Sequence, residues 1–370
     1  GGSSEPSAGQ RLVLLLAAVL GFLPVYYGGF QVMEFCTNPF RTLHIHPRSY
    51  IICCPSWFSD KNQVIVKGDY KNLWDVWNHD NFKRLRRYWL NGNKSLCDNC
   101  PLFLTQPQWI QVKRDYMREE MKAAPQVIVF ANDATCNLHC WTCRSKPIIE
   151  KRQQQIFEQT ENVLDTFKDG IKFFSAIGSG DPFASPAWLK ILQTIDIKKF
   201  NSPEIEIFTN GVLLPKYWDS LSHIHDNIIR IKMSVDAASP GVYERTRLGG
   251  RWRDMDNAMK FISKLGRQYI LNMIVQADNY TDIPLFIERA IDHNATRVNL
   301  TMLKNWPDLR GGTAAFNEAD LSQPGNPHHD KFISLLERES ALLNHPIVDA
   351  SRIYPAGQAI IRNIQQSNIS

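Results

Sequence analysis

The stretch Ala134-Thr-Cys-Asn-Leu-His-Cys-Trp-Thr-Cys-Arg144 contains three cysteines, Cys136, Cys140 and Cys143, spaced by three residues and then by two. A short loop with this spacing can turn three thiolates to one side. Three thiolates can ligate three irons of a [4Fe–4S] cube, which ordinarily takes four cysteines, and so leave one iron open to a small molecule. The alternative is a structural zinc site, which needs a fourth Cys or His nearby. His139 could only compete for the same metal, so the spacing favours the cluster.

Six short apolar runs, each bounded by turn residues, start just before these cysteines and have the pattern of buried strands. They are 125–131, 171–177, 204–209, 228–235, 269–275 and 297–303. Amphipathic stretches of helical period lie between them, at 153–167, 188–195, 255–265 and 283–292. Strand–helix alternation predicts parallel strands with right-handed crossovers. Because six units fall short of the eight that close a full barrel, we expect an open partial barrel with ligands at the carboxyl ends of its strands.

Polar residues follow the strands where that rule places ligands. The sequences are Gly178-Ser-Gly-Asp-Pro182, Thr209-Asn-Gly211, Ser234-Val-Asp236, Val275-Gln276 with Asn279 beyond it, and 299–306. Each alone is an ordinary turn former. Their recurrence after successive strands predicts a binding site along one rim.

The chain from about 125 to 306 resembles the radical S-adenosylmethionine (SAM) superfamily, whose hallmark is C-x3-C-x2-C after the first strand of a partial (β/α)6 barrel. The resemblance implies that the methionyl amine and carboxylate of SAM chelate the open iron. It also implies reductive cleavage of SAM to a 5′-deoxyadenosyl radical, which abstracts hydrogen from a substrate C–H bond.

The resemblance implies SAM-binding roles for the residues at matching positions. Ser179, Gly180 and Asp181 occupy the Gly-Gly-Glu motif that holds the SAM amino group, with Ser179 and Asp181 departing from its usual residues. Ser234 and Asp236 match the polar pair that faces the ribose and the methionyl carboxylate.

Two further positions of the resemblance lie nearer the adenine. Gln276 matches a polar position at the fifth strand, and Leu303 lies where backbone contacts adenine. The residue before the third cysteine is commonly aromatic in the family. Here it is Thr142, with Trp141 one place early, which departs from the pattern.

Five other cysteines precede the triplet, an awkward number for disulfides, which a reduced intracellular iron enzyme would not form. They are Cys36, Cys53, Cys54, Cys97 and Cys100. The segment resembles the SPASM/twitch auxiliary-cluster module of radical SAM enzymes that modify peptides, placed here before the barrel. The resemblance implies an auxiliary [4Fe–4S] cluster on four of these cysteines. Cys53 is the spare, because Ser49 takes the family's glycine place five residues before Cys54. The alternative is a four-Cys zinc knuckle with the same ligands.

The module's predicted elements are a strand pair over 35–45 and 50–55, and one helix that opens at 73–78, continues through the basic stretch 83–87 and ends at Gly92. Cys53, as the cysteine left over, is a weak candidate for a hydrogen-atom donor. A small buried residue beside a ligand is the simpler interpretation.

The predicted organisation is a tag or flexible tail (1–10), an apolar helix (11–30), the module (31–110), the barrel (120–310) and a C-terminal loop and helix (311–370). Residues 12–30 have no charge and approach the ~20 needed to span a bilayer. Glycines and Pro24 break the second half of this stretch, so we favour a buried or docking helix over a membrane anchor. We expect a loop at 307–327 and a terminal helix at 329–343.

The net charge of +5, from 42 basic and 37 acidic residues, does not by itself indicate nucleic acid, and none is expected as a partner. The expected partners are SAM, a peptide or protein substrate, and an electron donor such as flavodoxin or ferredoxin, in the cytoplasm. A sugar or other small-molecule dehydrogenase or epimerase is the alternative enzyme. A zinc-stabilised binding protein without turnover is the alternative of another class.

Overall fold

The computed structural model describes residues 37–53, 64–91, 117–143, 148–305 and 312–353, together with the backbone of 26–27 and 30–31. The predicted auxiliary ligands Cys36, Cys54, Cys97 and Cys100 lie outside the described residues, as does most of 12–30. The chain divides into two compact units: residues 1–44 and 48–127 belong to the first, and residues 45–47 and 128–370 belong to the second.

The first unit holds a small sheet and three helices. Its strands β3 (Thr42–His46), β4 (Ser49–Ile51) and β5 (Ile65–Lys67) neighbour one another in that order, and β4 pairs antiparallel with β5. The helices are α2 (Asn38–Arg41), α3 (Leu73–Trp77) and α4 (Asp80–Leu90), and the strands β1 (Tyr26–Tyr27) and β2 (Phe30–Gln31) form an antiparallel pair. β3 and β4 correspond to the predicted strand pair, with shorter bounds.

The single helix expected from 73 onward is wrong, because the chain forms two. The side chain of Asn78 explains the break. Its Oδ1 accepts from Met121 N at 2.7 Å and its Nδ2 donates to Met121 O at 3.0 Å, which ties the end of α3 to a distant segment. The His79 ring then caps α4 by accepting from Asn81 N at 3.2 Å. Such a long-range tie leaves no local pattern in the sequence.

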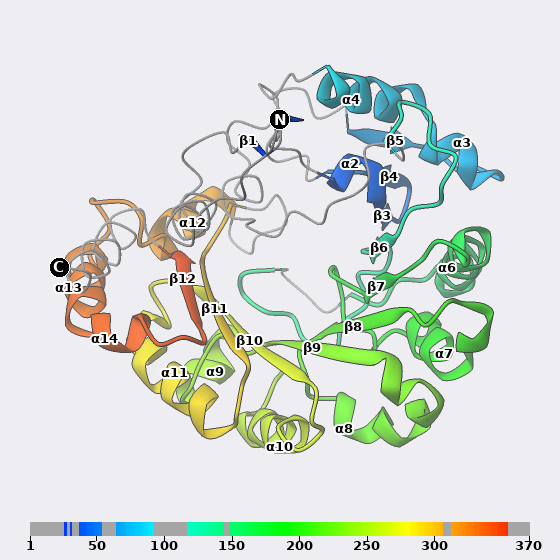
Figure 1. The fold of residues 1–370 in the computed structure, drawn as a ribbon. Helices are drawn as coiled ribbons and strands as arrows, with labels where there is room; N and C mark the ends of the chain where they lie inside the picture. Colours follow the sequence, from blue (N-terminus) through cyan, green and yellow to red (C-terminus); the bar gives the residue numbers. More distant parts are fainter. Residues whose placement is uncertain are drawn as a thin grey trace, which may run out of the picture. The chain divides into compact units, whose positions relative to one another are not determined.

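The second unit is built on a curved sheet of seven neighbouring strands (Figure 1). They are β6 (Val127–Phe130), β7 (Phe173–Ala176), β8 (Glu204–Thr209), β9 (Ile228–Ser234), β10 (Gln268–Val275), β11 (Arg297–Met302) and β12 (Val348–Arg352). Every pair from β7 to β12 is parallel. The six predicted strands are all present and the partial barrel is confirmed, while β12 is an addition to the prediction.

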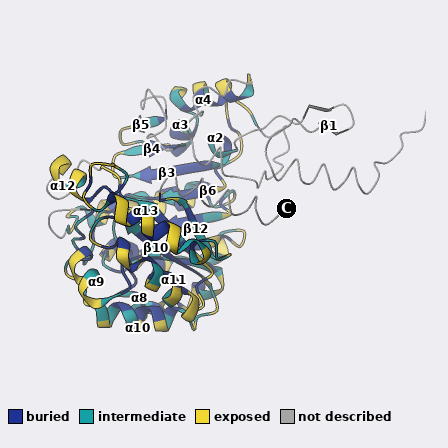
Figure 2. Ribbon diagram, turned by 90° about the vertical axis from the view of Figure 1, so that its left-hand side faces the viewer, coloured by how far each residue is buried: buried dark blue, intermediate teal, exposed yellow. Residues whose placement is uncertain are grey.

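Helices cover the outer side of this sheet (Figure 1) and expose their outward faces (Figure 2). They are α6 (Gln153–Phe167), α7 (Pro186–Thr194), α8 (Leu214–Tyr217), α9 (Pro240–Thr246), α10 (Trp252–Ile262), α11 (Ile283–Asp292), α12 (Gly312–Ala319), α13 (His329–Arg338) and α14 (Ser340–Leu343), with 3-10 turns η5 (Ile197–Lys199), η6 (Trp218–Asn227) and η7 (Tyr280–Asp282). α6 and α11 have the predicted bounds. α12 lies within the stretch expected to be a loop, and the terminal helix is interrupted at Glu339.

The other face of the sheet is polar and half-exposed, because side chains alternate between the two faces of a strand. On β9, Ile231 and Met233 are buried, whereas Arg230, Lys232 and Ser234 are half-exposed. A closed barrel would fill this interior with branched apolar residues. The inner face of this sheet therefore has the polar surface of a binding site and not the apolar packing of a hydrophobic core.

No helix among the described residues is both long enough and apolar enough to cross a membrane.

Candidate functional site

The three cysteines lie on the loop that leaves β6, at the carboxyl end of the first barrel strand. Cys140 is buried, Cys136 is half-buried and Cys143 is exposed. The loop turns back on itself, since Cys143 N donates to Cys140 O at 3.0 Å and Leu138 N lies 3.5 Å from Cys136 Sγ. Within the described part of the chain, no group of three or more His, Cys, Asp or Glu side chains could hold a single metal ion.

The turn that follows α9 packs directly against this loop. His139 N donates to Leu248 O at 3.0 Å, and Trp141 N donates to Thr246 O at 3.2 Å. From the same turn, Arg247 donates from one terminal nitrogen to Cys140 Sγ at 3.4 Å. Burial raises the pKa of the Cys140 thiol, and the Arg247 guanidinium opposes that shift. Arg247 is thus placed to stabilise the thiolate that metal ligation requires.

The loop after β7, with Ser179, Gly180 and Asp181, is braced against the residues that follow β6. Gly178 N donates to Phe130 O at 3.0 Å, and Ser179 Oγ donates to Ala131 O at 3.2 Å. Asp181 N donates to Thr135 O at 2.8 Å. Two strand ends and the cysteine loop are therefore held as one assembly.

Gly180 lies too close to backbone for any side chain. A Cβ there would lie 2.3 Å from Thr135 O and 2.8 Å from Asp133 O. Three positions earlier, Ile177 has φ 55°, a left-handed conformation that is rare for a β-branched residue. Unusual backbone of this kind is concentrated at functional sites.

The Asp181 carboxylate is fully buried and bonded to its own chain. It accepts from Thr209 Oγ1 at 2.7 Å and Asn210 N at 2.8 Å, both at the end of β8. Burial raises its pKa, while these hydrogen bonds lower it. Its role toward the SAM amine stays a prediction. In the structure, the Asp181 carboxylate holds the loop after β7 to the end of β8. Asn210 in turn donates to Asn137 Oδ1 at 2.8 Å and lies 3.7 Å from Cys136 Sγ.

Asp236 follows β9 with φ 62° and forms a buried ion pair. Its Oδ2 lies 2.7 Å from an Arg247 terminal nitrogen, and its Oδ1 accepts from Ile274 N at 2.7 Å. Burial raises the pKa of the Asp236 carboxyl, and Arg247 opposes this. Ser234, two residues earlier at the end of β9, is half-exposed on the polar face. The ribose and carboxylate roles predicted for these two residues stay predictions.

Gln276 presents the clearest ligand-binding signal in the rim. Its side chain is 1% exposed, and neither its Oε1 nor its Nε2 has a hydrogen-bond partner among the described residues. Its backbone is fixed, because Gln276 N donates to Asn279 Oδ1 at 2.9 Å. Buried amides are ordinarily satisfied, so each such group needs an explanation. A bound polar ligand would supply one.

A cavity of about 150 Å³ lies at the carboxyl ends of β10 and β11. Thr142 of the cysteine loop lines it together with Ile274, Thr301, Met302, Leu303 and Lys304. The structure thus brings Thr142 and Leu303, the two positions related to adenine, to one cavity. Trp141 packs against the small cluster of Leu303 and Ala319 instead. Trp141, which stands one place early in the motif, thus still contacts Leu303, a residue that lines the cavity.

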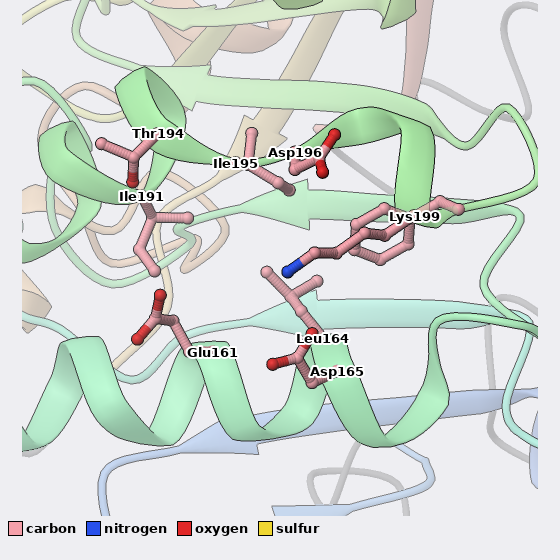
Figure 3. Close-up of a pocket in the computed structure, with 9 residues that line it drawn as sticks. Glu161, Leu164, Asp165, Ile191, Thr194, Ile195, Asp196 and Lys199 are labelled. Carbon is pink, nitrogen blue, oxygen red and sulfur yellow. The ribbon is translucent and has the colours of Figure 1, made fainter.

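A second cavity, a groove of about 90 Å³, lies between α6, α7 and the residues that lead into β8 (Figure 3). Glu161 and Asp165 come from α6, and Lys199 points into the groove. Residues leading into a parallel strand lie at its amino end, opposite the cysteine loop. This groove therefore has no part in the site described above.

Sequence reasoning missed Arg247, the residue that joins Cys140 to Asp236. Its only sequence signal is the arginine-rich stretch in which it lies, and this stretch has the appearance of a solvated turn. Asn210 was within a strand-end motif that the sequence singled out, but its approach to Cys136 was not expected. The weak hydrogen-donor candidate Cys53 follows β4 in the first unit and is half-buried, and its role stays a prediction.

Residues 134–290 match the family model of the radical SAM superfamily. The cysteine motif, the partial barrel and the braced strand ends define the same class. Residues 134–290, less than half of the chain, are thus similar to a superfamily whose members are enzymes and whose cofactors are a [4Fe–4S] cluster with SAM.

Among curated proteins, GTP 3',8-cyclase of Alkaliphilus oremlandii (strain OhILAs) is 26% identical over 162 residues, which cover 42% of this chain and 50% of that protein. A probable GTP 3',8-cyclase of Archaeoglobus fulgidus is 24% identical over 177 residues, 46% of this chain and 57% of that protein. The chain thus spans about half the length of the curated relatives it matches.

Two solved structures are similar at low identity. Streptococcus suis SuiB bound to precursor peptide SuiA matches 79% of this chain and 56% of that one, at 13% identity and a TM-score of 0.44. Native anSMEcpe with bound AdoMet matches 60% of this chain and 63% of that one, at 11% identity and a TM-score of 0.40. Neither superposition is close enough to support a conclusion about this chain.

Proposed function

We propose that this chain reductively cleaves SAM and removes hydrogen from an unreactive C–H bond of a peptide or protein. When bound, the cluster and SAM would supply the radical chemistry, and the chain's share is binding, orientation and exclusion of water. Cys136, Cys140 and Cys143 would hold the cluster. The observation that most supports the proposal is that the cysteine loop is joined, through hydrogen bonds, to the ends of β7, β8 and β9.

The residues present fit these groups. Thiolates of iron–sulfur clusters accept N–H hydrogen bonds that tune them. Arg247 donates to Cys140 Sγ, and Leu138 N and Asn210 Nδ2 donate to Cys136 Sγ. The unpartnered Gln276 amide and the cavity beside Leu303 would bind the polar and adenine parts of SAM. Ser179, Gly180, Asp181, Ser234 and Asp236 complete the rim.

A peptide substrate is proposed from the resemblance of the N-terminal cysteines to an auxiliary-cluster module. Cys36, Cys54, Cys97 and Cys100 would hold that second cluster. The half-exposed polar face of the sheet suits a substrate with many hydrogen-bonding groups. On this face Asn299 Nδ2 donates to Asn272 Oδ1 at 2.9 Å, so paired amides line two adjacent strands.

A nucleotide or other small-molecule substrate is the second candidate, because the curated relatives are named as GTP 3',8-cyclases. Their alignments cover less than half of this chain. A shared SAM-cleaving barrel accounts for that extent of similarity without a shared substrate.

The test is anaerobic incubation of the reconstituted protein with SAM and reductant, with either peptides encoded near the gene or GTP. Mass spectrometry reads 5′-deoxyadenosine and any mass change in the added compound. We expect stimulation and a mass change with a peptide. The peptide proposal fails if GTP or a sugar is modified while no peptide is, and a colourless zinc protein without iron removes the enzymatic proposal altogether.

A further inference from the structure

The surface over the cysteine loop is formed by the segment from α9 to the start of α10. Its turn touches the loop closely, as the backbone bonds from His139 to Leu248 and from Trp141 to Thr246 show. A Cβ on Gly249 would lie 3.2 Å from the His139 Nδ1 atom. This segment therefore packs directly on the cysteine loop on both sides of the buried Cys140.

Two aromatic residues of this segment, Tyr243 in α9 and Trp252 in α10, pack against each other. Tyr243 is fully buried, and its ring centroid lies 5.7 Å from that of Trp252 in an edge-to-face arrangement. Tyr243 O accepts from the backbone nitrogen of Arg247 at 2.7 Å, and the Arg247 guanidinium contacts Cys140 Sγ. Trp252, on α10, is half-exposed. A path of close contacts thus runs from Cys140 past Arg247 and Tyr243 to a ring at the surface.

The Tyr243 hydroxyl has no structural use that explains its burial. It has no hydrogen-bond partner among the described residues, and a Cβ on Gly250 would lie 2.8 Å from it. Burial raises the pKa of the Tyr243 phenol, which therefore stays neutral. The charge of Arg247 lowers this pKa, and that of Cys140 raises it. Tyr243 is thus an uncharged ring beside the cysteine loop.

The segment at the exposed end of the path carries more basic than acidic side chains. Residues 244–254 contain four arginines and two acids. Arg247 is turned inward to Asp236, while Arg245 and Arg251 are exposed and the Arg253 side chain is 78% exposed. Both acids are engaged, since Glu244 accepts from Trp252 N at 3.1 Å and Asp254 pairs with Arg253 at 3.6 Å.

We propose that Trp252 with Arg245, Arg251 and Arg253 is the docking surface for a small acidic electron-carrier protein. Arg251 and Arg253 flank Trp252 in the chain, and the Arg289 guanidinium lies over the Trp252 ring at 5.1 Å. Tryptophan and arginine together are the composition of protein interfaces. The proposal rests on the proposed function. One electron would pass from the carrier to the cluster that Cys140 would help to hold, across Trp252 and Tyr243. No bond would form or break and no proton would move.

The test measures the rate at which the visible absorbance of the reconstituted cluster bleaches, with reduced flavodoxin or with dithionite. Arg251→Glu with Arg253→Glu should lower the bimolecular rate with flavodoxin roughly tenfold or more at low ionic strength, because steering by opposite charge has that size. Added salt should remove the difference. The rate with dithionite should equal that of the wild type.

The matched control is Arg338→Glu, since Arg338 is also an exposed arginine paired with the acid that follows it, at 2.9 Å. It should leave both rates unchanged. Trp252→Leu should lower the rate at saturating flavodoxin, and Trp252→Phe, which keeps a ring, should retain most of it. Equal flavodoxin rates in all variants overturn the proposal, as does an equal loss with dithionite. If dithionite bleaches no absorbance in the wild type, the proposed function itself has failed.

Discussion

Two residues at the rim, Ile177 and Asp236, adopt left-handed backbone conformations with φ 55° and 62°. Each such residue costs on the order of 1–3 kcal/mol and persists only where its surroundings determine it. Ile177 directly follows β7, and Asp236 lies two residues beyond the end of β9. The strain itself could not be predicted from sequence, because Ile177 is a residue type that disfavours this conformation.

Gly180 should tolerate no side chain. Gly180→Ala forces backbone apart, because the new Cβ would meet Thr135 O at 2.3 Å. We expect a loss of about 1–3 kcal/mol in the free energy of unfolding, the usual range for overpacking. Gly178→Ala is the matched control, since nothing lies within 4 Å of a Cβ there. Urea unfolding of both variants checks this, and equal stabilities would contradict the close approach.

Arg247 should be the most costly arginine to neutralise. Arg247→Gln leaves the buried Asp236 carboxylate without its partner, and breaking a buried pair in this way costs about 3–5 kcal/mol. Arg267→Gln removes a pair whose acid, Asp226, is fully exposed, so about 0–1 kcal/mol is expected. Denaturant midpoints compare the two. A loss at Arg247 no larger than at Arg267 would show that the pair does not hold the loop.

At the scale of elements, strands and long amphipathic helices were predictable because their periodicity is local. All six predicted strands form, and α6 and α11 have the expected bounds. β12 was missed because Val348-Asp-Ala-Ser-Arg352 has little apolar pattern, and its strand conformation comes from pairing with β11. The break between α3 and α4 was missed because it depends on Met121, far along the chain.

The edge pair β11–β12 should weaken in acid. Burial raises the pKa of Asp349, but hydrogen bonds from Ser351 and Arg297 lower it further, so the folded-state pKa lies below the unfolded one, about 3.9. This contribution to stability is present above the unfolded pKa and is lost as pH falls through the folded pKa. Asp349→Asn should flatten the decline in the free energy of unfolding below about pH 4. An unchanged slope would show that Asp349 does not contribute.

At the scale of the whole molecule, the sequence predicted the barrel and the position of the three cysteines, but not how they are held. The links through Arg247, Asn210 and Thr135 join loops far apart in sequence, and no local pattern encodes them. The auxiliary cluster remains a prediction, because Cys36, Cys54, Cys97 and Cys100 lie outside the described residues.

Iron content tests that second cluster. Two cubes predict about eight irons per reconstituted chain, against about four for the triplet alone. Cys53→Ala should keep the full complement and Cys54→Ala should not. The opposite result exchanges their roles, and about four irons in the wild type would remove the auxiliary cluster from the account.

The most direct test is 5′-deoxyadenosine formation by the protein in which Cys136, Cys140 and Cys143 are all changed to Ala. Reconstituted anaerobically with SAM and reductant, it should form no 5′-deoxyadenosine while keeping the iron of the auxiliary cluster, about four per chain. Continued formation of 5′-deoxyadenosine at the wild-type rate would contradict the assignment of these cysteines to SAM cleavage.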